Sequence, residues 1–291
     1  MPNLTPAKPV GRTKRLKQTV LSTAAVLFFV IMAFPVYWMV NCSFLPLNKI
    51  RSATPTFFPG GDFTLRNYDS AIFDNHRAQF LPALEQSLKV TFVALILSLI
   101  VAFLASLAVG RFIFRGRKLF IVAILVIQMI PAEAMMLTYF RMMDSWHMTE
   151  SIAGLGLIYL ASVLPFTIWT LRGFVTAVPA ELEEAAMVDG LSRTGAFWRI
   201  TFPLLAPGLI STGIFAFIQA WNEFTMALVI MQRPENMTLP VWLRTFQQAT
   251  RTSDWGGLMA GSTLIAIPVL IFFLIVQGRM TGGLVAGAVK G

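Results

Sequence analysis

Residues 179–203 read PAELEEAAMVDGLSRTGAFWRITFP and form the longest polar break in the second half of an otherwise apolar chain. Pro179 and the glutamates after it favour the first turn of a helix. Proline needs no amide hydrogen there, and carboxylates favour the positive end of the helix dipole. Gly190 ends this helix, and Ser192 can cap a second one that reaches Ile200. The stretch therefore predicts a helix–turn–helix outside the membrane, between two membrane spans.

The composition is that of a membrane protein. Of 291 residues, 56% are hydrophobic and 13% are charged, whereas soluble domains hold about a quarter of charged residues. The net charge of +9 does not indicate nucleic-acid binding, because the lysines and arginines lie in the gaps between apolar runs. Membrane lipid is an expected partner and nucleic acid is not. The single cysteine, Cys42, allows no internal disulfide and shows no metal-ligand spacing.

Six apolar runs are each long enough to cross a bilayer, which takes about 20 residues of helix. None shows the alternation of a barrel strand, so the predicted fold class is an all-α membrane protein with six transmembrane helices. Pro131, Pro165 and Pro268 lie inside runs and predict kinks. The runs cover residues 20–40, 90–109, 119–140, 152–171, 204–231 and 258–276.

The spans divide the chain into an ordered series of segments. A basic N-terminus (1–19) precedes the first span (20–40), and a polar extracytoplasmic segment (41–86) follows it. The core (87–278) holds spans two to six and the loop 179–203, and a tail (279–291) ends the chain.

The distribution of basic residues predicts the orientation. Lysine and arginine number fourteen in the termini and in the loops on their side, against seven in the opposite loops. The excess marks the cytoplasmic side. We therefore expect a multi-pass membrane protein with both termini and the loop 179–203 in the cytoplasm.

The helix–turn–helix resembles the EAA loop of ABC importer permeases, whose pattern is E-A-A, three residues, G, nine residues, I-x-L-P. Here it reads Glu184-Ala185-Ala186, then Gly190, then Ile200-Thr201-Phe202-Pro203, with Phe202 where leucine is usual. The resemblance implies a type I importer fold in the plasma membrane, the bacterial inner membrane, with a coupling helix that docks on a cytoplasmic ATPase. The residues implied in coupling are Glu184, Ala185, Ala186, Asp189, Gly190, Ile200 and Pro203.

Two further stretches are similar to the maltose-type, carbohydrate-importing group of that family. Residues 221–224 read WNEF, and Trp221, Asn222 and Glu223 are candidates for the substrate path. A polar clamp that holds this helix against a partner helix explains them equally well. The tail from Gly282 resembles one that reaches the ATPase interface, which implies that Gly287 and Lys290 contact the ATPases.

Catalytic and metal-binding patterns are missing from the sequence. The phosphate-binding pattern G-x-x-x-x-G-K-[ST] does not occur, and the two histidines, His76 and His147, stand alone in outer loops. We therefore expect no catalytic residue, no metal and no cofactor bound by this chain. The family resemblance implies that ATP and Mg are used by the partner ATPase.

The resemblance implies the permease subunit of a sugar importer, with a di- or oligosaccharide as substrate. The implied partners are a second homologous permease in a heterodimer, two cytoplasmic ATPase subunits and an extracytoplasmic solute-binding protein. The same type of permease for glycerol phosphate or another polar solute is the alternative, although the spans show no basic cluster for a phosphate. More distant alternatives are an ion-driven secondary transporter, which predicts an internal repeat, and a membrane anchor or assembly protein.

Overall fold

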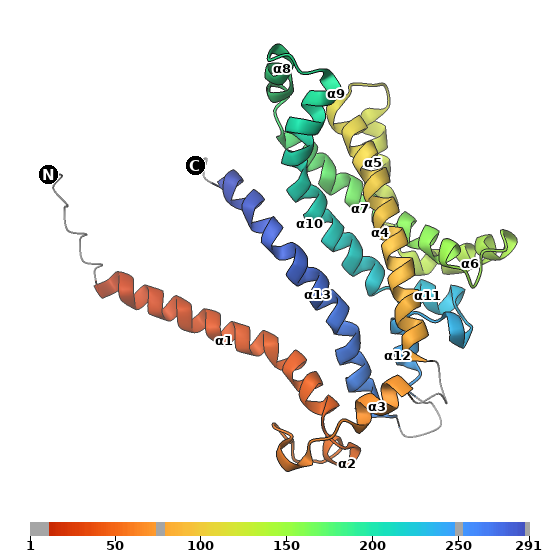
Figure 1. Ribbon diagram of the computed structural model, residues 1–291. Helices are drawn as coiled ribbons and strands as arrows, with labels where there is room; N and C mark the ends of the chain where they lie inside the picture. Colours follow the sequence, from red (N-terminus) through yellow and green to blue (C-terminus); the bar gives the residue numbers. More distant parts are fainter. Residues whose placement is uncertain (1–11, 74–78, 248–252, 289–291) are drawn as a thin grey trace.

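The computed structural model describes residues 12–73, 79–247 and 253–288, and of residues 12–16 and 279–288 it describes only the backbone. Within these ranges every regular element is a helix. Figure 1 shows long tilted helices, with shorter ones at the two ends and, at α6 and α11, along one side. The long helices are α1 (Arg12–Ser43), α4 (Phe80–Arg111), α7 (Ile152–Ala177), α10 (Phe202–Trp221) and α13 (Trp255–Ala288). The shorter ones are α2 (Leu47–Ile50), η1 (Gly60–Asp62), α3 (Arg66–Phe73), α5 (Arg117–Gln128), η2 (Ala132–Met135), α6 (Met136–Ser145), α8 (Glu181–Val188), α9 (Arg193–Ala196), η3 (Phe197–Thr201), α11 (Thr225–Ile230), η4 (Pro234–Asn236) and α12 (Leu239–Arg244).

The all-α membrane fold is confirmed, with one qualification about the spans. Five helical segments of the described chain are long and apolar enough to cross a membrane. A sixth exists if α5 and the following η2–α6 segment count as one span, and these two are bent by 87° at their junction. The run at 119–140, predicted as one span, is therefore broken. Pro131 lies at the break, where it has no amide hydrogen to continue the helix.

The run at 204–231 is also divided, which corrects the prediction of one long span. α10 ends at Trp221, and α11 begins at Thr225. The side chain of Glu223 accepts hydrogen bonds from the amides of Met226 (2.7 Å) and Ala227 (3.0 Å), so it supplies the acceptors that the first turn of a new helix lacks. A polar cap rather than a proline makes this break.

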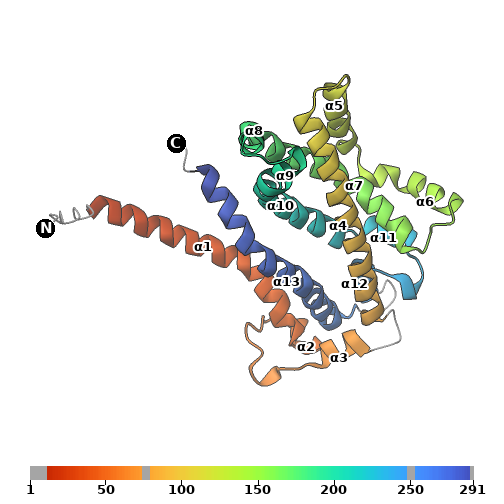
Figure 2. The same ribbon diagram turned by 45° about the horizontal axis from the view of Figure 1, so that its top comes forward.

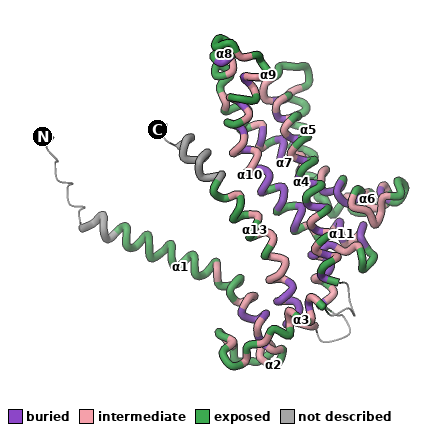
Figure 3. The backbone as a smooth tube through the Cα atoms, viewed as in Figure 1, coloured by how far each residue is buried: buried purple, intermediate pink, exposed green. Residues whose placement is uncertain are grey.

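Close backbone approach holds the centre of the bundle together. A Cβ added at Gly208 of α10 would lie 2.4 Å from the ring of Phe174 in α7, and one at Gly110 of α4 would lie 2.5 Å from Val175. Small residues at such crossings are how helices pack inside membranes, where lipid removes the hydrophobic driving force. α4, α7 and α10 therefore form the packed centre of the molecule, and Figure 3 shows buried stretches in purple along α7 and α10.

The first helix stands apart from this centre. α1 meets α13 near its C-terminal end and then diverges from it, as Figures 1 and 2 both show. None of the apolar window of α1 is buried inside the molecule. Phe28 and Phe29, for example, are 65% and 70% exposed. A helix this apolar needs lipid or another protein around it.

The segment predicted as polar and extracytoplasmic, 41–86, is more ordered than the sequence indicates. α1 continues to Ser43, α2, η1 and α3 follow, and α4 begins at Phe80, ten residues before the predicted second span. The side-chain amide of Asn67 donates to the carbonyls of Ser43 (2.9 Å) and Leu45 (2.8 Å), which fixes α3 against the end of α1. This region and the α8–α9 region lie at opposite ends of the molecule in Figures 1 and 2.

Candidate functional site

The predicted helix–turn–helix is present and has the predicted turns. α8 carries three glutamates in its first turn, as the macrodipole favours. Gly190 has φ +92°, the left-handed conformation that suits glycine after a helix end. A Cβ at Gly190 would meet nothing within 4 Å, so the backbone angle and not packing requires glycine there. Ser192 accepts a hydrogen bond from the amide of Gly195 (3.2 Å), which confirms it as the cap of α9.

The second helix runs without interruption into the membrane. α9 continues through a π-helical turn, η3, into α10, so that residues 193–221 form one helical rod. Thr201, at the end of η3, is fully buried. The rod is a direct mechanical link from the exposed loop to the bundle.

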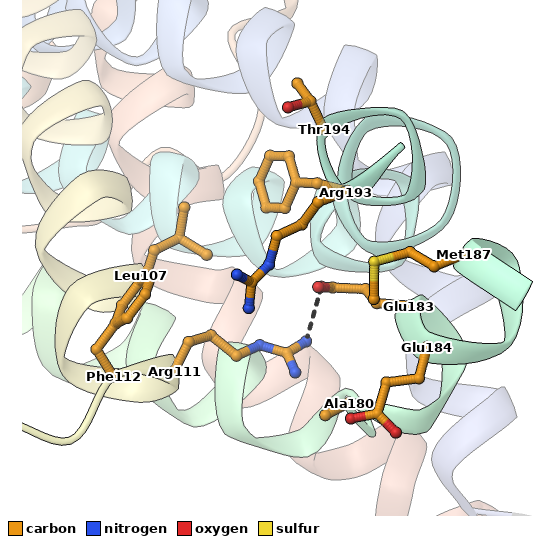
Figure 4. A pocket seen from close by; sticks show the side chains of 10 residues that line it. Leu107, Arg111, Phe112, Ala180, Glu183, Glu184, Met187, Arg193 and Thr194 are labelled. Atoms are coloured by element: carbon orange, nitrogen blue, oxygen red, sulfur yellow. Dashed lines mark ion pairs between the residues drawn. The ribbon is translucent and has the colours of Figure 1, made fainter. Parts of the chain in front are cut away.

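The residue that ties α8 to the bundle is Glu183, which sequence reasoning missed. Its carboxylate accepts a hydrogen bond from the hydroxyl of Thr201 and lies 3.5 Å from the guanidinium of Arg111 at the end of α4. Figure 4 shows the carboxylate pointing inward between the two helices. Nothing in the local pattern separates Glu183 from the other two glutamates of α8, because its partners lie 18 and 72 positions away in the chain.

A pocket of about 470 Å³ lies behind α8. Arg111 and Phe112 form one wall, Glu183, Glu184 and Met187 another, and Arg193 also points inward (Figure 4). Beside the pocket, Glu183 and the buried side chain of Ala186 attach α8 to the neighbouring helices.

The predicted coupling residues are mostly on the surface. Glu184, Ala185, Asp189, Gly190 and Pro203 are exposed, Ile200 is half-buried and Ala186 is buried. Next to them, Leu182 (42% exposed) and Val188 (88% exposed) present apolar side chains to the outside. An exposed helix with apolar side chains among carboxylates is suited to insertion into a cleft of another protein.

A second cavity, of about 620 Å³, lies where the two helix breaks meet. The α5–α6 break lines one side and residues near the α10–α11 break line the other, with α7 between them. Non-helical backbone inside a membrane is tolerated only where it is buried in protein or lines a water-filled space. The polar side chains that line this cavity besides Glu223 are Gln128, Glu133, Tyr139, Tyr159, Ser162 and Gln219.

The three candidates of the WNEF stretch separate in the structure. Trp221 is only 1% exposed, stacks on Phe217 and donates from its indole nitrogen to the carbonyl of Ile265 (3.3 Å), so it cannot offer a face to a sugar. The amide of Asn222 donates to Ile218 within its own helix (2.9 Å), and Asn222 does not line the cavity. Only Glu223 does, while capping α11. For Trp221, the buried ring and the hydrogen bond to α13 favour the polar clamp over the substrate path.

Two further predictions concern the tail and metal binding. Lys290 lies outside the described residues, and Gly287 lies in the last turns of α13, where only the backbone is described. Among the described residues, no group of three or more histidine, cysteine, aspartate or glutamate side chains is placed to hold a metal ion.

Relatives with known transport roles match almost the entire chain. It is 45% identical to the diacetylchitobiose uptake system permease protein DasC of Streptomyces coelicolor, over 93% of this chain and 96% of that protein. It is 33% identical to the trehalose/maltose transport system permease protein MalG of Thermococcus litoralis, over 96% of this chain and 99% of that protein.

The fold matches a solved structure as well. A chain of a bacterial ABC transporter involved in the import of the acidic polysaccharide alginate superposes with a TM-score of 0.75, over 94% of this chain and 99% of that one, at 20% identity. Residues 102–281, which include the helix–turn–helix and both sides of the cavity, match a family described as the inner membrane component of binding-protein-dependent transport systems. The protein belongs to this family of inner membrane transport components.

Proposed function

We propose that the chain is the permease subunit of an ATP-driven importer of a di- or oligosaccharide. The relatives named for diacetylchitobiose and for trehalose and maltose support a sugar as substrate. The observation that carries the proposal is α8, an exposed short helix that is pinned to two membrane helices by one carboxylate. In this proposal the chain performs no bond chemistry, and ATP and Mg are used by partner subunits.

The proposed assembly has three kinds of protein partner. A second, homologous permease packs against the exposed apolar helices of this chain. Two ATPase subunits bind α8 at the cytoplasmic end. A solute-binding protein delivers the sugar at the opposite end, where α2 and α3 lie. Both termini then lie in the cytoplasm. The unburied apolar surface of α1 supports a contact with another membrane-embedded protein or with lipid.

The proposed mechanism follows the two attachments of Glu183. Closure of the ATPases moves α8, and the carboxylate passes that motion to α4 through Arg111 and to the α9–α10 rod through Thr201. Because α10 and α5 end in breaks at the cavity, the helix segments beyond them can change angle without stretching regular hydrogen bonds. The cavity is the sugar path of this subunit, where hydroxyl and amide side chains can bond sugar hydroxyls.

Two alternatives are less well supported. A phosphate substrate needs a cationic site, and no lysine or arginine is among the residues that line the cavity. If the chain were an ion-driven transporter, the attachment of α8 to the bundle through Glu183 would have no explained role.

The test is reconstitution. The chain is co-expressed with the second permease, the ATPase and the solute-binding protein from the same gene neighbourhood, and the purified complex is placed in liposomes. Uptake of a labelled disaccharide should need both ATP inside and binding protein outside. Uptake that persists without the ATPase refutes the proposal, and so does failure of the ATPase to copurify with the permease pair.

A further inference from the structure

The cavity at the two helix breaks carries two acidic side chains, Glu133 and Glu223, and none of its lining residues is basic. The nearest arginine along the chain, Arg141 of α6, is exposed and is not part of the lining. The two carboxylates differ in their hydrogen-bond partners. Glu223 has both oxygens engaged by backbone amides of α11, which offset its charge.

Glu133 has no such engagement. It lies in η2, directly after Pro131 at the bend between α5 and α6, and it is exposed. Within the part of the chain that the structure describes, its carboxylate has no hydrogen bond or ion pair. A carboxylate inside a membrane span costs about 2.5–3.5 kcal/mol on insertion scales, and such groups face water-filled cavities or protein. Glu133 therefore places an uncompensated negative charge at the wall of a cavity with low-dielectric surroundings, which concentrates the field inside it.

We propose that Glu133 makes the cavity a charge filter, which repels anionic saccharides and admits neutral ones and those that carry an amine. This inference rests on the proposed role of the cavity as the sugar path and adds the chemical class that the path excludes. Uronates, sugar phosphates and sulfonated sugars are the excluded class, because each would bring a second negative charge beside Glu133 without a cation to balance it.

The filter can be measured without knowing the sugar. Cys42, which is 4% exposed, is replaced by alanine, and Ser162, an exposed residue of the cavity lining, is replaced by cysteine. The assembled transporter is exposed, in spheroplasts and in opened membranes, to cationic, uncharged and anionic thiosulfonates of similar size. Labelling of this chain is read by mass spectrometry after purification, and each rate is divided by that for a free thiol in solution.

The cationic reagent should react on the order of tenfold faster than the anionic one, as expected for focusing by a single charge in a cleft. Glu133→Gln should bring the ratio to within about twofold of unity, and Glu133→Lys should invert it. Asp144→Asn is the matched control: it removes an exposed carboxylate of the neighbouring α6 that does not line the cavity, and it should leave the ratio unchanged.

Equal rates for the two charged reagents, or a ratio that survives Glu133→Gln, overturn the charge filter. Failure of the proposed path gives a different result. The cavity is not the sugar path if the uncharged reagent fails to label Ser162→Cys from either side of the membrane. The same conclusion follows if the reagent labels Ser162→Cys fully and disaccharide uptake continues unchanged. The filter as a property of transport falls with it.

Discussion

Replacing Glu183 by alanine should uncouple α8 from the membrane helices while leaving the helices themselves in place. The ion pair with Arg111 spans 3.5 Å, and the two side chains are only 19% and 21% exposed. At an effective dielectric constant of about 20, attraction over this distance is about 5 kcal/mol, and desolvation offsets a large part of it. With the hydrogen bond to Thr201 included, we expect a net loss of about 2 kcal/mol. Detachment of α8 then becomes about 30-fold more populated.

The assay is the ratio of ATP hydrolysed to sugar imported by the reconstituted complex. Glu183→Ala should raise this ratio at least several-fold, because hydrolysis continues while motion of α8 no longer reaches α4. Glu181→Gln is the control, since Glu181 is an exposed carboxylate of the same first turn. Arg111→Ala should give a smaller defect of the same kind, because it leaves the hydrogen bond from Thr201, and the double variant should be no worse than Glu183→Ala alone, as expected for a shared interaction. Normal coupling in Glu183→Ala, or additive defects in the double variant, refutes the reasoning.

Three further outcomes are expected. Gly190→Asp should abolish sugar-stimulated ATP hydrolysis with the spans still inserted and the partner permease still copurified, and Gly190→Val should do the same without a charge, because a β-branched side chain is strained at φ +92°; full activity in Gly190→Val would remove the backbone argument. Gly208→Leu should lower the thermal midpoint of the detergent-solubilised complex by several degrees, because its side chain meets the ring of Phe174; an unchanged midpoint contradicts the packing. An impermeant thiol reagent should label exposed Ala53→Cys in intact spheroplasts, whereas native Cys42 is too buried to report orientation; labelling only after the membrane is opened reverses the topology.

The sequence predicts those elements whose signals lie in neighbouring residues. Gly190 and Ser192 mark the turns of the helix–turn–helix through their own backbone and side-chain chemistry, and the structure has both. The apolar runs give the long helices in the same way, through length and composition. The ends of these helices were misjudged, as at Phe80, because hydropathy does not show where a helix continues past the apolar core.

The features that sequence reasoning missed depend on contacts between distant residues. Glu183 looked no different from Glu184, and only the position of Arg111 distinguishes them. For Trp221 the sequence leaves a substrate contact and a polar clamp equally open, and only the ring of Phe217 and the carbonyl of Ile265 around it favour the clamp. The cavity could not be foreseen for the same reason, since it forms only when two breaks far apart in the chain are brought to one place.

The π-helical turn η3 is where the chain holds one residue more than a continuous α-helix needs. Deleting one residue among the five of η3 would let α9 and α10 join as a regular α-helix, with the direction of both preserved. The same deletion inside α10 would turn everything beyond it by about 100°, because an α-helix has 3.6 residues per turn. The same turn ends at Thr201, whose hydroxyl donates a hydrogen bond to Glu183. Length changes in descendants of this sequence should therefore collect at residues 197–201, and they should appear together with changes at position 183.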